Sequence, residues 1–345
     1  MMKNRSNYRL VMYVNVFVIL FQMHFVPLKG VNYATGPDLA EGPSELKYKR
    51  YTEGSEHPFM DGRSLKLEVM ASNLSGVSGL VIEPDSGGVY LSDTGGGIVY
   101  YFDQADGLTA YINREITESS GKRLINVENP TGLEIDNSGK LIVCDQGAIG
   151  VRRRESKFRW KELAVSSEKH RLSGPTDIIL ASDGSYYFSD SRLFKENFEN
   201  CGVYRRAKNG RVSLLYDGLT NPAGMAFSEK ESHLFIANAD PKNSAVFRFD
   251  VGKAGKLTNP VEWPMLDNGE NYWKSKIPSV VRNIGGDCLV VAHDEILSFF
   301  HMDGKMLGSI SMPEKIGSVA LDGAKEYLWV GGKSKLFRIT AEDLE

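Results

Sequence analysis

The chain has 345 residues, of which 41% are hydrophobic and 25% charged, with a formal net charge of −3. This composition is typical of a soluble globular protein, and its slightly acidic balance argues against a nucleic-acid partner. Glycine is frequent, at 35 residues, and aromatic residues make up 10%. Both values suit a β-rich fold with many tight turns.

The N-terminal segment differs from the rest of the chain. Three basic residues among the first nine precede an apolar run at 11–28. This order predicts a secretory signal peptide over residues 1–34, cleaved near Ala34, and a secreted or lumenal protein without further membrane contact. The run is about long enough to span a bilayer, so an uncleaved anchor is the alternative. Asn15, Gln22 and His24 weaken that alternative.

Residues 35–62 are polar and contain glycine and proline, which predicts a loosely ordered lead-in. The stretch at 63–72 then reads as a strand. We expect it to supply an outer strand to the last repeat of the fold and so to fasten the N-terminal part of the domain to its C-terminal end.

A repeated two-strand unit follows. Each copy has a small residue, an apolar strand, a polar turn and a second apolar strand; the copies lie at 78–93, 131–145, 176–190, 223–238, 279–294 and 318–332. Material for one or two further strands follows each copy. A period of this length, with four strands, is the signature of a propeller blade. Residues 63–345 are therefore predicted to form an all-β, six-bladed propeller of four-stranded antiparallel blades around a central channel, most simply as a monomer.

Cys144, Cys201 and Cys288 follow the leader segment. Cys144 and Cys288 lie within apolar strand patterns, which predicts buried thiols. An oxidising compartment would allow one disulfide among the three, and the sequence does not select the pair.

Three of the repeats carry a family likeness: "NPTGLEIDNSGKLIVCDQGAIGVRRRE", "GPTDIILASDGSYYFSDSRLF" and "NPAGMAFSEKESHLFIANAD". With their spacing, they resemble the senescence marker protein/gluconolactonase family of six-bladed propellers, which includes regucalcin-like proteins and lactone hydrolases. The resemblance covers roughly residues 65–340. It implies one divalent cation, calcium or zinc, at the channel mouth, held by a Glu, two Asn and an Asp that stand just before or at the start of innermost strands.

The positions that match this mouth ring carry no carboxylate and no side-chain amide: they are Ser78, Thr131, Thr176, Ala223, Ser279 and Ser318. Ser78 stands at the position of the expected Glu, and Ser279 stands at the position of the expected Asp. Thr176 and Ala223 stand at the positions of the two expected Asn. Five hydroxyls and a methyl group do not offset the dehydration of a dication by charge. We therefore expect no cofactor at the family positions.

A second set of polar residues stands where the second strand of each repeat ends: Asp93, Asp145, Asp190, Asn238 and Asp294. If the second strand returns to the mouth, these groups crowd the same face. They are either relocated metal ligands or turn residues that accept backbone N–H bonds. Asp190 and Asp145 are the first candidates for a functional role. His293 beside Asp294 is a candidate general base near neutral pH.

The run "VRRRESKFRWK" at 151–161 carries six basic residues. It is either a surface for an anionic ligand such as a glycan or a charged outer edge that keeps the blade soluble.

Three function classes are compatible with the sequence. One is a diverged binding protein without hydrolase activity, which takes a small molecule or a protein partner at the channel mouth. The second, implied by the resemblance, is a secreted hydrolase of sugar lactones or related esters that uses calcium or zinc on relocated Asp ligands. The third is metal-independent chemistry, as in strictosidine-synthase-like propellers.

Overall fold

The structure is a computed structural model that describes residues 44–50, 59, 64–117, 121, 123–167, 171–191, 201–263, 266–267, 270–271 and 276–342. Every described residue belongs to the unit formed by residues 35–345. The expected signal segment lies outside the described residues and stays a prediction. Within the described ranges, no helix has the length and apolar character needed to cross a membrane.

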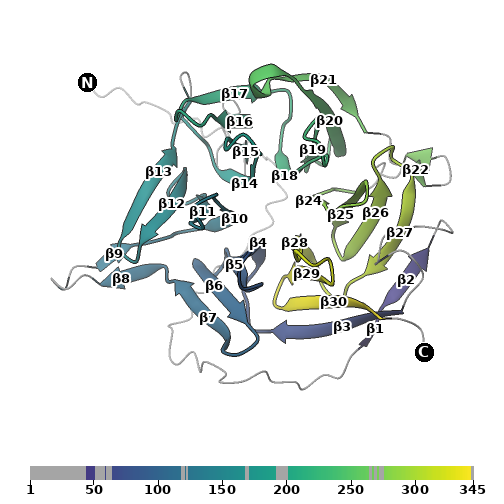
Figure 1. The fold of residues 1–345 in the computed structure, drawn as a ribbon, viewed down its shortest axis with the longest axis horizontal. Coiled ribbons are helices and arrows are strands. Elements are labelled where there is room, and N and C mark those ends of the chain that lie inside the picture. Colours follow the sequence, from purple (N-terminus) through teal and green to yellow (C-terminus); the bar gives the residue numbers. More distant parts are fainter. Residues whose placement is uncertain are drawn as a thin grey trace, which may run out of the picture. The chain divides into compact units, whose positions relative to one another are not determined.

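Six blades of antiparallel strands surround a central axis (Figure 1), which confirms the predicted propeller. Blades 1 to 4 each have four strands, ordered below from the axis outwards. Blade 1 is β4 (Val77–Ile82), β5 (Val89–Asp93), β6 (Ile98–Asp103) and β7 (Gly107–Ile112). Blade 2 is β10 (Pro130–Ile135), β11 (Leu141–Asp145), β12 (Gly150–Ser156) and β13 (Arg159–Ala164). Blade 3 is β14 (Pro175–Leu180), β15 (Tyr186–Asp190), β16 (Gly202–Arg206) and β17 (Val212–Tyr216). Blade 4 is β18 (Pro222–Phe227), β19 (His233–Asn238), β20 (Ala245–Val251) and β21 (Leu257–Glu262).

Blades 5 and 6 each include strands from the N-terminal part of the domain. Blade 5 is β24 (Val280–Asn283), β25 (Cys288–His293), β26 (Ile296–His301), β27 (Met306–Ser311) and β2 (Lys47–Arg50). Blade 6 is β28 (Ile316–Leu321), β29 (Tyr327–Gly332), β30 (Leu336–Glu342), β3 (Ser64–Ala71) and β1 (Ser44–Glu45).

The predicted closure by residues 63–72 is confirmed, because β3 pairs antiparallel with β30 in the last blade. Arg338 of β30 also donates from Nη2 to Oε2 of Glu68 in β3, at 2.8 Å. This pairing joins the N-terminal part of the domain to its C-terminal strand and so closes the ring. Within the predicted lead-in, β1 and β2 add short strands outside β3 and β27, so part of this segment is paired.

Two small hairpins connect blades. They are β8 (Glu115–Thr117) with β9 (Arg123–Ile125), and β22 (Leu266–Asp267) with β23 (Glu270–Asn271). Among the described residues the helical content is a three-residue 3-10 turn at Lys253–Gly255. This agrees with the predicted all-β fold.

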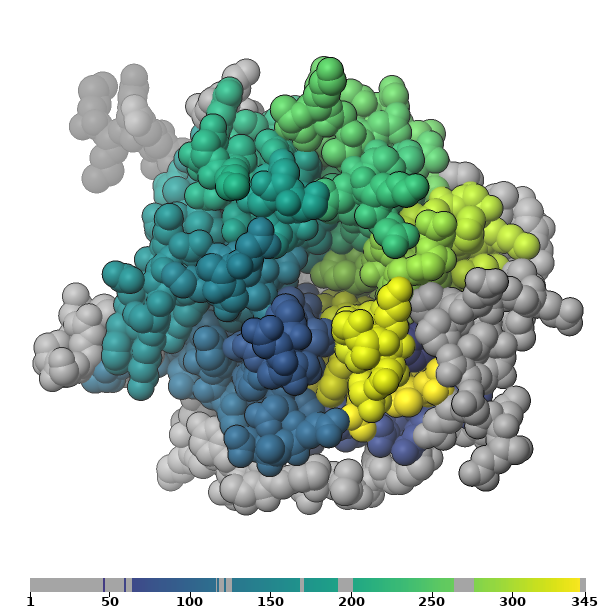
Figure 2. All heavy atoms as spheres, in the orientation of Figure 1, coloured from purple at the N-terminus to yellow at the C-terminus, as the bar shows by residue number. Residues whose placement is uncertain are grey.

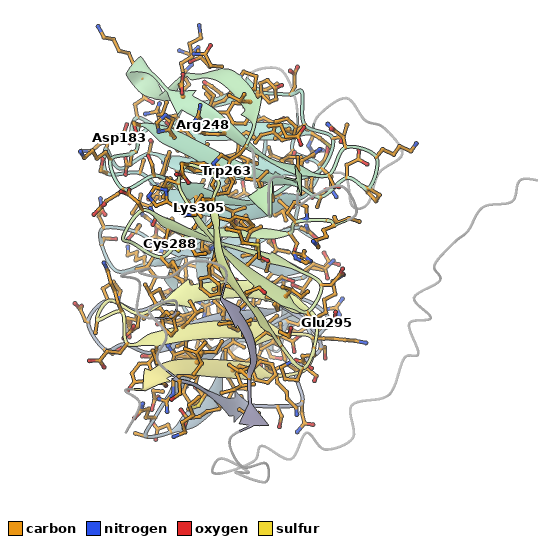
Figure 3. The ribbon with its side chains drawn as sticks, turned by 90° about the vertical axis from the view of Figure 1, so that its right-hand side faces the viewer. Asp183, Arg248, Trp263, Cys288, Glu295 and Lys305 are labelled. Atoms are coloured by element: carbon orange, nitrogen blue, oxygen red, sulfur yellow. The ribbon has the colours of Figure 1, made fainter. Side chains whose placement is uncertain are left out.

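Apolar residues fill the spaces between neighbouring blades. The second strands β5, β11 and β15 are buried along their whole length, as strands covered on both faces should be. Trp263, labelled in Figure 3, packs edge-on against Phe235 of blade 4 and Phe300 of blade 5 and donates its Nε1 hydrogen to the Met302 carbonyl at 3.0 Å. Burial of such large side chains between sheets is the main contribution to stability.

The three cysteines are buried and form no disulfide with one another. Cys144 and Cys288 lie in the second strands of blades 2 and 5, which confirms their prediction as buried thiols. Burial raises the pKa of Cys288 to about 12 and keeps its thiol protonated.

Candidate functional site

The six mouth positions lie at one end of the inner ring, in the first two or three residues of β4, β10, β14, β18 and β28 and just before β24. Thr131, Ala223 and Ser318 are buried, and Ser78, Thr176 and Ser279 are partly exposed. In the space-filling view the blades meet closely around the axis (Figure 2). The ring is a neutral layer of small side chains.

Most of these hydroxyls form hydrogen bonds with other groups of the protein. Thr131 Oγ1 donates to the carbonyl of Pro175 in blade 3 at 3.0 Å. Thr176 Oγ1 lies 2.6 Å from Ser191 Oγ and 3.1 Å from the Gly174 carbonyl. Ser78 Oγ accepts from Thr94 at 2.8 Å. The hydroxyl of Ser318 is buried and has no hydrogen-bond partner among the described residues. These groups join neighbouring blades and turns rather than converging on one point.

The divalent cation that the resemblance implies does not fit this ring. Calcium and zinc sites need converging oxygen or nitrogen ligands, usually with one or more carboxylates, to replace hydration. Here the donors are neutral hydroxyls that already bond to backbone carbonyls or to each other. One unpaired hydroxyl, that of Ser318, supplies neither the charge nor the number of ligands.

The second polar set lies at the same end of the blades, as the strand directions predicted. The register pairs Asp93 with Val77, Asp145 with Pro130 and Asp190 with Pro175. Asn238 pairs with Pro222 in the same way. The first strand of each blade therefore leaves the mouth and the second returns to it.

These polar side chains accept hydrogen bonds from the backbone that leads into the first strand. Asp190 accepts from Ser173 N at 2.7 Å and Gly174 N at 2.5 Å, and Asp93 accepts twice from Ser75 N at 3.0 Å. Asp145 accepts from the backbone amides of residues 128, 129 and 148 and pairs with Arg152. Asn238 accepts from Asn221 N at 2.9 Å. An Asp in three blades and an Asn in the fourth thus hold the same turn.

In the described part of the chain, the side chains proposed as relocated metal ligands do not come together to form a metal site. Among those residues, no group of three or more His, Cys, Asp or Glu side chains is placed to hold a metal ion. Asp294 departs from the other members: its side chain is 65% exposed and lies 3.8 Å from Lys315 Nζ. A catalytic role for Asp190 stays a prediction.

The surroundings of His293 do not suit a general base that acts near neutral pH. Its side chain is buried, and burial together with the charge of Lys276 lowers the pKa of His293 to about 4. The imidazole is therefore neutral at physiological pH and a weak base. Its exposed neighbour Asp294 opposes this shift but does not cancel it.

Asp177, Arg282 and Glu134 form a charged layer on the inner strands, which the sequence analysis did not predict. Arg282 of β24 reaches past blade 4 to Asp177 of β14 and forms two parallel bonds, from Nη1 to Oδ2 at 2.7 Å and from Nη2 to Oδ1 at 2.8 Å. Nη1 also donates to the carbonyl of Met225 in β18, at 3.1 Å, and Met225 N donates to Asp177 at 2.8 Å. One ion pair thus connects the inner strands of blades 3, 4 and 5.

Glu134 of β10 belongs to the same charged layer. Its carboxylate accepts from its neighbour Ile135 N at 2.9 Å and from Leu180 N of blade 3 at 3.1 Å. Burial raises the pKa of Glu134 to about 7, because the backbone bonds and Arg282 offset only part of the desolvation. The signal for this layer was present in the sequence: each of the three residues is a charge inside an otherwise apolar inner strand.

Comparisons with known proteins agree with this architecture. The family model described as the SMP-30/Gluconolactonase/LRE-like region matches residues 105–331, more than half of the chain. A gluconolactonase of Zymomonas mobilis is 23% identical over 206 residues, which cover 57% of this chain. The match spans 58% of the length of that curated relative.

Two solved structures show the same fold at low identity. A gluconolactonase from Xanthomonas campestris is 19% identical with a TM-score of 0.74, over 89% of this chain and 98% of that one. A calcium-binding protein, regucalcin, from Agrobacterium tumefaciens is 12% identical with a TM-score of 0.60, over 80% of this chain and 95% of that one. With the family model and the six-bladed ring together, this chain belongs to the SMP-30/gluconolactonase/LRE-like family.

Proposed function

We propose that this chain is a binding member of its family, which holds a neutral polar small molecule at the mouth ring and lacks metal-dependent hydrolase activity. The observation that carries the proposal is the donor chemistry of that ring. Neutral hydroxyls stand at the positions of the expected Glu, Asp and first Asn, and a methyl group stands at the position of the second Asn.

The charged layer supports the same conclusion. On the axis, the carboxylate of Asp177 is neutralised by the chain's own guanidinium, from Arg282. A bidentate arginine–carboxylate pair satisfies the acid without any bound ion. The carboxylates of Asp93, Asp145 and Asp190 accept backbone N–H groups, which leaves them poorly disposed to move toward a cation.

Metal-independent acid–base chemistry is the second candidate, and Glu134 favours it. A carboxyl group with a pKa of about 7 can donate or accept a proton near neutral pH. Glu134 stands three residues beyond Thr131 in β10, which at about 3.3 Å per residue places it about 10 Å from the mouth ring. A substrate for this chemistry would have to reach the charged layer rather than stop at the hydroxyls.

Secretion is proposed on the N-terminal pattern alone, a basic start followed by an apolar run. N-terminal sequencing of the protein recovered from the medium of expressing cells tests it. A mature N-terminus near Ala34 would support cleavage, whereas an intact N-terminus in the membrane fraction would support the anchor.

A sugar-lactone hydrolysis assay with millimolar calcium or zinc tests the main proposal, with the Zymomonas gluconolactonase as the active control. We expect no rate above that of the buffer. In parallel, a panel of neutral polyhydroxy compounds should include one that raises the unfolding midpoint by mass action. Thr176→Val should abolish that rise, and Thr109→Val, at an exposed position on β7, should not.

Cation-dependent lactone turnover that Asp190→Asn abolishes would overturn the proposal in favour of the hydrolase with relocated ligands. Cation-independent turnover that Glu134→Gln abolishes would favour the second candidate. A panel in which Thr176→Val and Thr109→Val behave alike would place ligand binding away from the mouth ring.

A further inference from the structure

Three consecutive arginines on the outer part of blade 2 have different surroundings. Arg153 forms ion pairs with Asp136 at 2.8 Å and Glu155 at 2.6 Å. Arg152 pairs with Asp145 and donates to the carbonyl of Asn126 at 2.8 Å. Both charges are therefore compensated by carboxylates within the chain.

Arg154 has no such compensation among the described residues. The residue is only 8% exposed, and the one side-chain hydrogen bond that it forms within the described part of the chain runs from Nη1 to Asn126 Oδ1 at 3.3 Å. Its guanidinium lies against two rings, 5.2 Å from the centre of Trp160 and 6.0 Å from that of Tyr111. Desolvation lowers the pKa of Arg154, whereas the pKa of Arg153 is raised by its acids. Burying an unpaired charge is costly, so a compensating anion is expected.

The groups around Arg154 are held in place by other contacts. Trp160 Nε1 donates to Asn126 Oδ1 at 2.8 Å, and Asn126 Nδ2 donates to the Asn113 carbonyl at 3.0 Å. Arg152 stacks on Trp160 at 4.7 Å. A guanidinium has five N–H donors in a fixed plane, and the described residues accept from one nitrogen of Arg154. The contacts with Asn126, Trp160 and Tyr111 restrict the guanidinium before any ligand arrives, which lowers the entropic cost of binding.

We propose that Arg154, Trp160 and Tyr111 form a site for a saccharide that carries a carboxylate or sulfate group. A guanidinium binds either oxyanion through two parallel hydrogen bonds. Tyr111 is 43% exposed, and its ring offers a flat apolar surface for the C–H face of a sugar. Exposed Lys157, Arg159 and Lys161 on the same hairpin favour an oligosaccharide with further anionic units. Of the two interpretations of the basic run, this arrangement favours the glycan surface.

Calorimetric titration with two probes tests the site: an unsulfated uronate oligosaccharide and a sulfated one of equal length. The two arms separate carboxylate from sulfate recognition. Arg154→Met keeps the apolar stem and removes the charge, and we expect it to weaken binding of the recognised probe at least about tenfold. Arg211→Met, which removes an exposed cation from blade 3, is the matched control and should change affinity by less than about twofold.

Measuring the stability of Arg154→Met distinguishes a loss of binding from a failure of this variant to fold. Without ligand, Arg154→Met should unfold at the same midpoint as the parent chain or higher, because an uncompensated buried charge is removed. Equal affinity of Arg154→Met and the parent chain would overturn the proposal, and so would an equal loss in Arg211→Met. Failure of both saccharides, together with binding of duplex DNA or anionic vesicles, would overturn the proposed ligand class.

Discussion

At the residue scale, the two inner-strand acids Asp177 and Glu134 show how one environment produces two chemistries. Asp177 receives a bidentate guanidinium and a backbone amide, so its negative charge is matched locally. Glu134 receives two backbone amides and only the longer-range field of the same arginine. The difference in partners separates a bidentate ion pair from a carboxyl group whose pKa is raised to about 7.

Glu134→Gln should change how stability depends on pH. Because burial raises the pKa of Glu134 from 4.5 to about 7, the folded state keeps a proton that the unfolded chain loses. The parent chain therefore has this contribution in full below pH 4.5 and loses it as pH rises to 7. The free energy of unfolding of the parent relative to Glu134→Gln should fall by about 3 kcal/mol across that window.

Denaturant unfolding of both proteins at several pH values between 4.5 and 8 measures this difference. Because the pKa of His293 is lowered to about 4, this residue makes the free energy of unfolding fall as pH decreases below 6.5. Both proteins contain His293, so its contribution cancels in the comparison. Parallel stability profiles for the two proteins would show that Glu134 titrates as it does in the unfolded chain.

At the element scale, glycine lets the inner strands approach one another closely. Gly224 N in β18 donates to the Ser279 carbonyl at 3.0 Å, across the boundary between blades 4 and 5. A Cβ atom at Gly224 would lie 2.6 Å from Val281 N and 2.7 Å from Val280 Cα. Backbone atoms cannot yield as a flexible side chain would, so this position requires glycine.

Gly224→Ala should lower the free energy of unfolding by about 2 kcal/mol, the cost typical of overpacking a close contact. Gly323→Ala is the matched control, since a Cβ there has no atom within 4 Å and the residue lacks a positive φ. We expect that control to be neutral or slightly stabilising. Chemical denaturation of both variants makes the comparison; similar stabilities would mean that the inner strands can separate at little cost.

The sequence predicted these elements unevenly. The alternation and the spaced small residues located all six inner strand pairs and the closing strand β3, because both depend on local pattern. The pairing of β2 with β27 depends on which outer edge is exposed once the ring has closed, and a short polar segment carries no signal for that. The Asp177–Arg282 pair joins residues 105 positions apart, and only the ring geometry brings them together.

At the scale of the whole molecule, the axis has two layers. The mouth ring is neutral, and the layer beyond it holds one guanidinium and two carboxyl groups that form their own contacts. The propeller scaffold of the family is kept, while the six positions of the mouth ring carry no charge that would attract a dication, and the nearby carboxylates of Asp93, Asp145 and Asp190 accept backbone N–H groups. Binding of a divalent cation is therefore the property that would separate this chain from a metal-dependent hydrolase.

Calorimetric titration of the purified protein with calcium and with zinc tests this property most directly. A variant that rebuilds the expected ligands, Ser78→Glu with Thr176→Asn, Ala223→Asn and Ser279→Asp, serves as the positive control once its fold is verified by circular dichroism. We predict no heat of binding for the parent chain at millimolar cation and measurable binding for the rebuilt variant. Stoichiometric binding of one cation by the parent chain, with a matching rise in its unfolding midpoint, would contradict the proposed loss of the cation site.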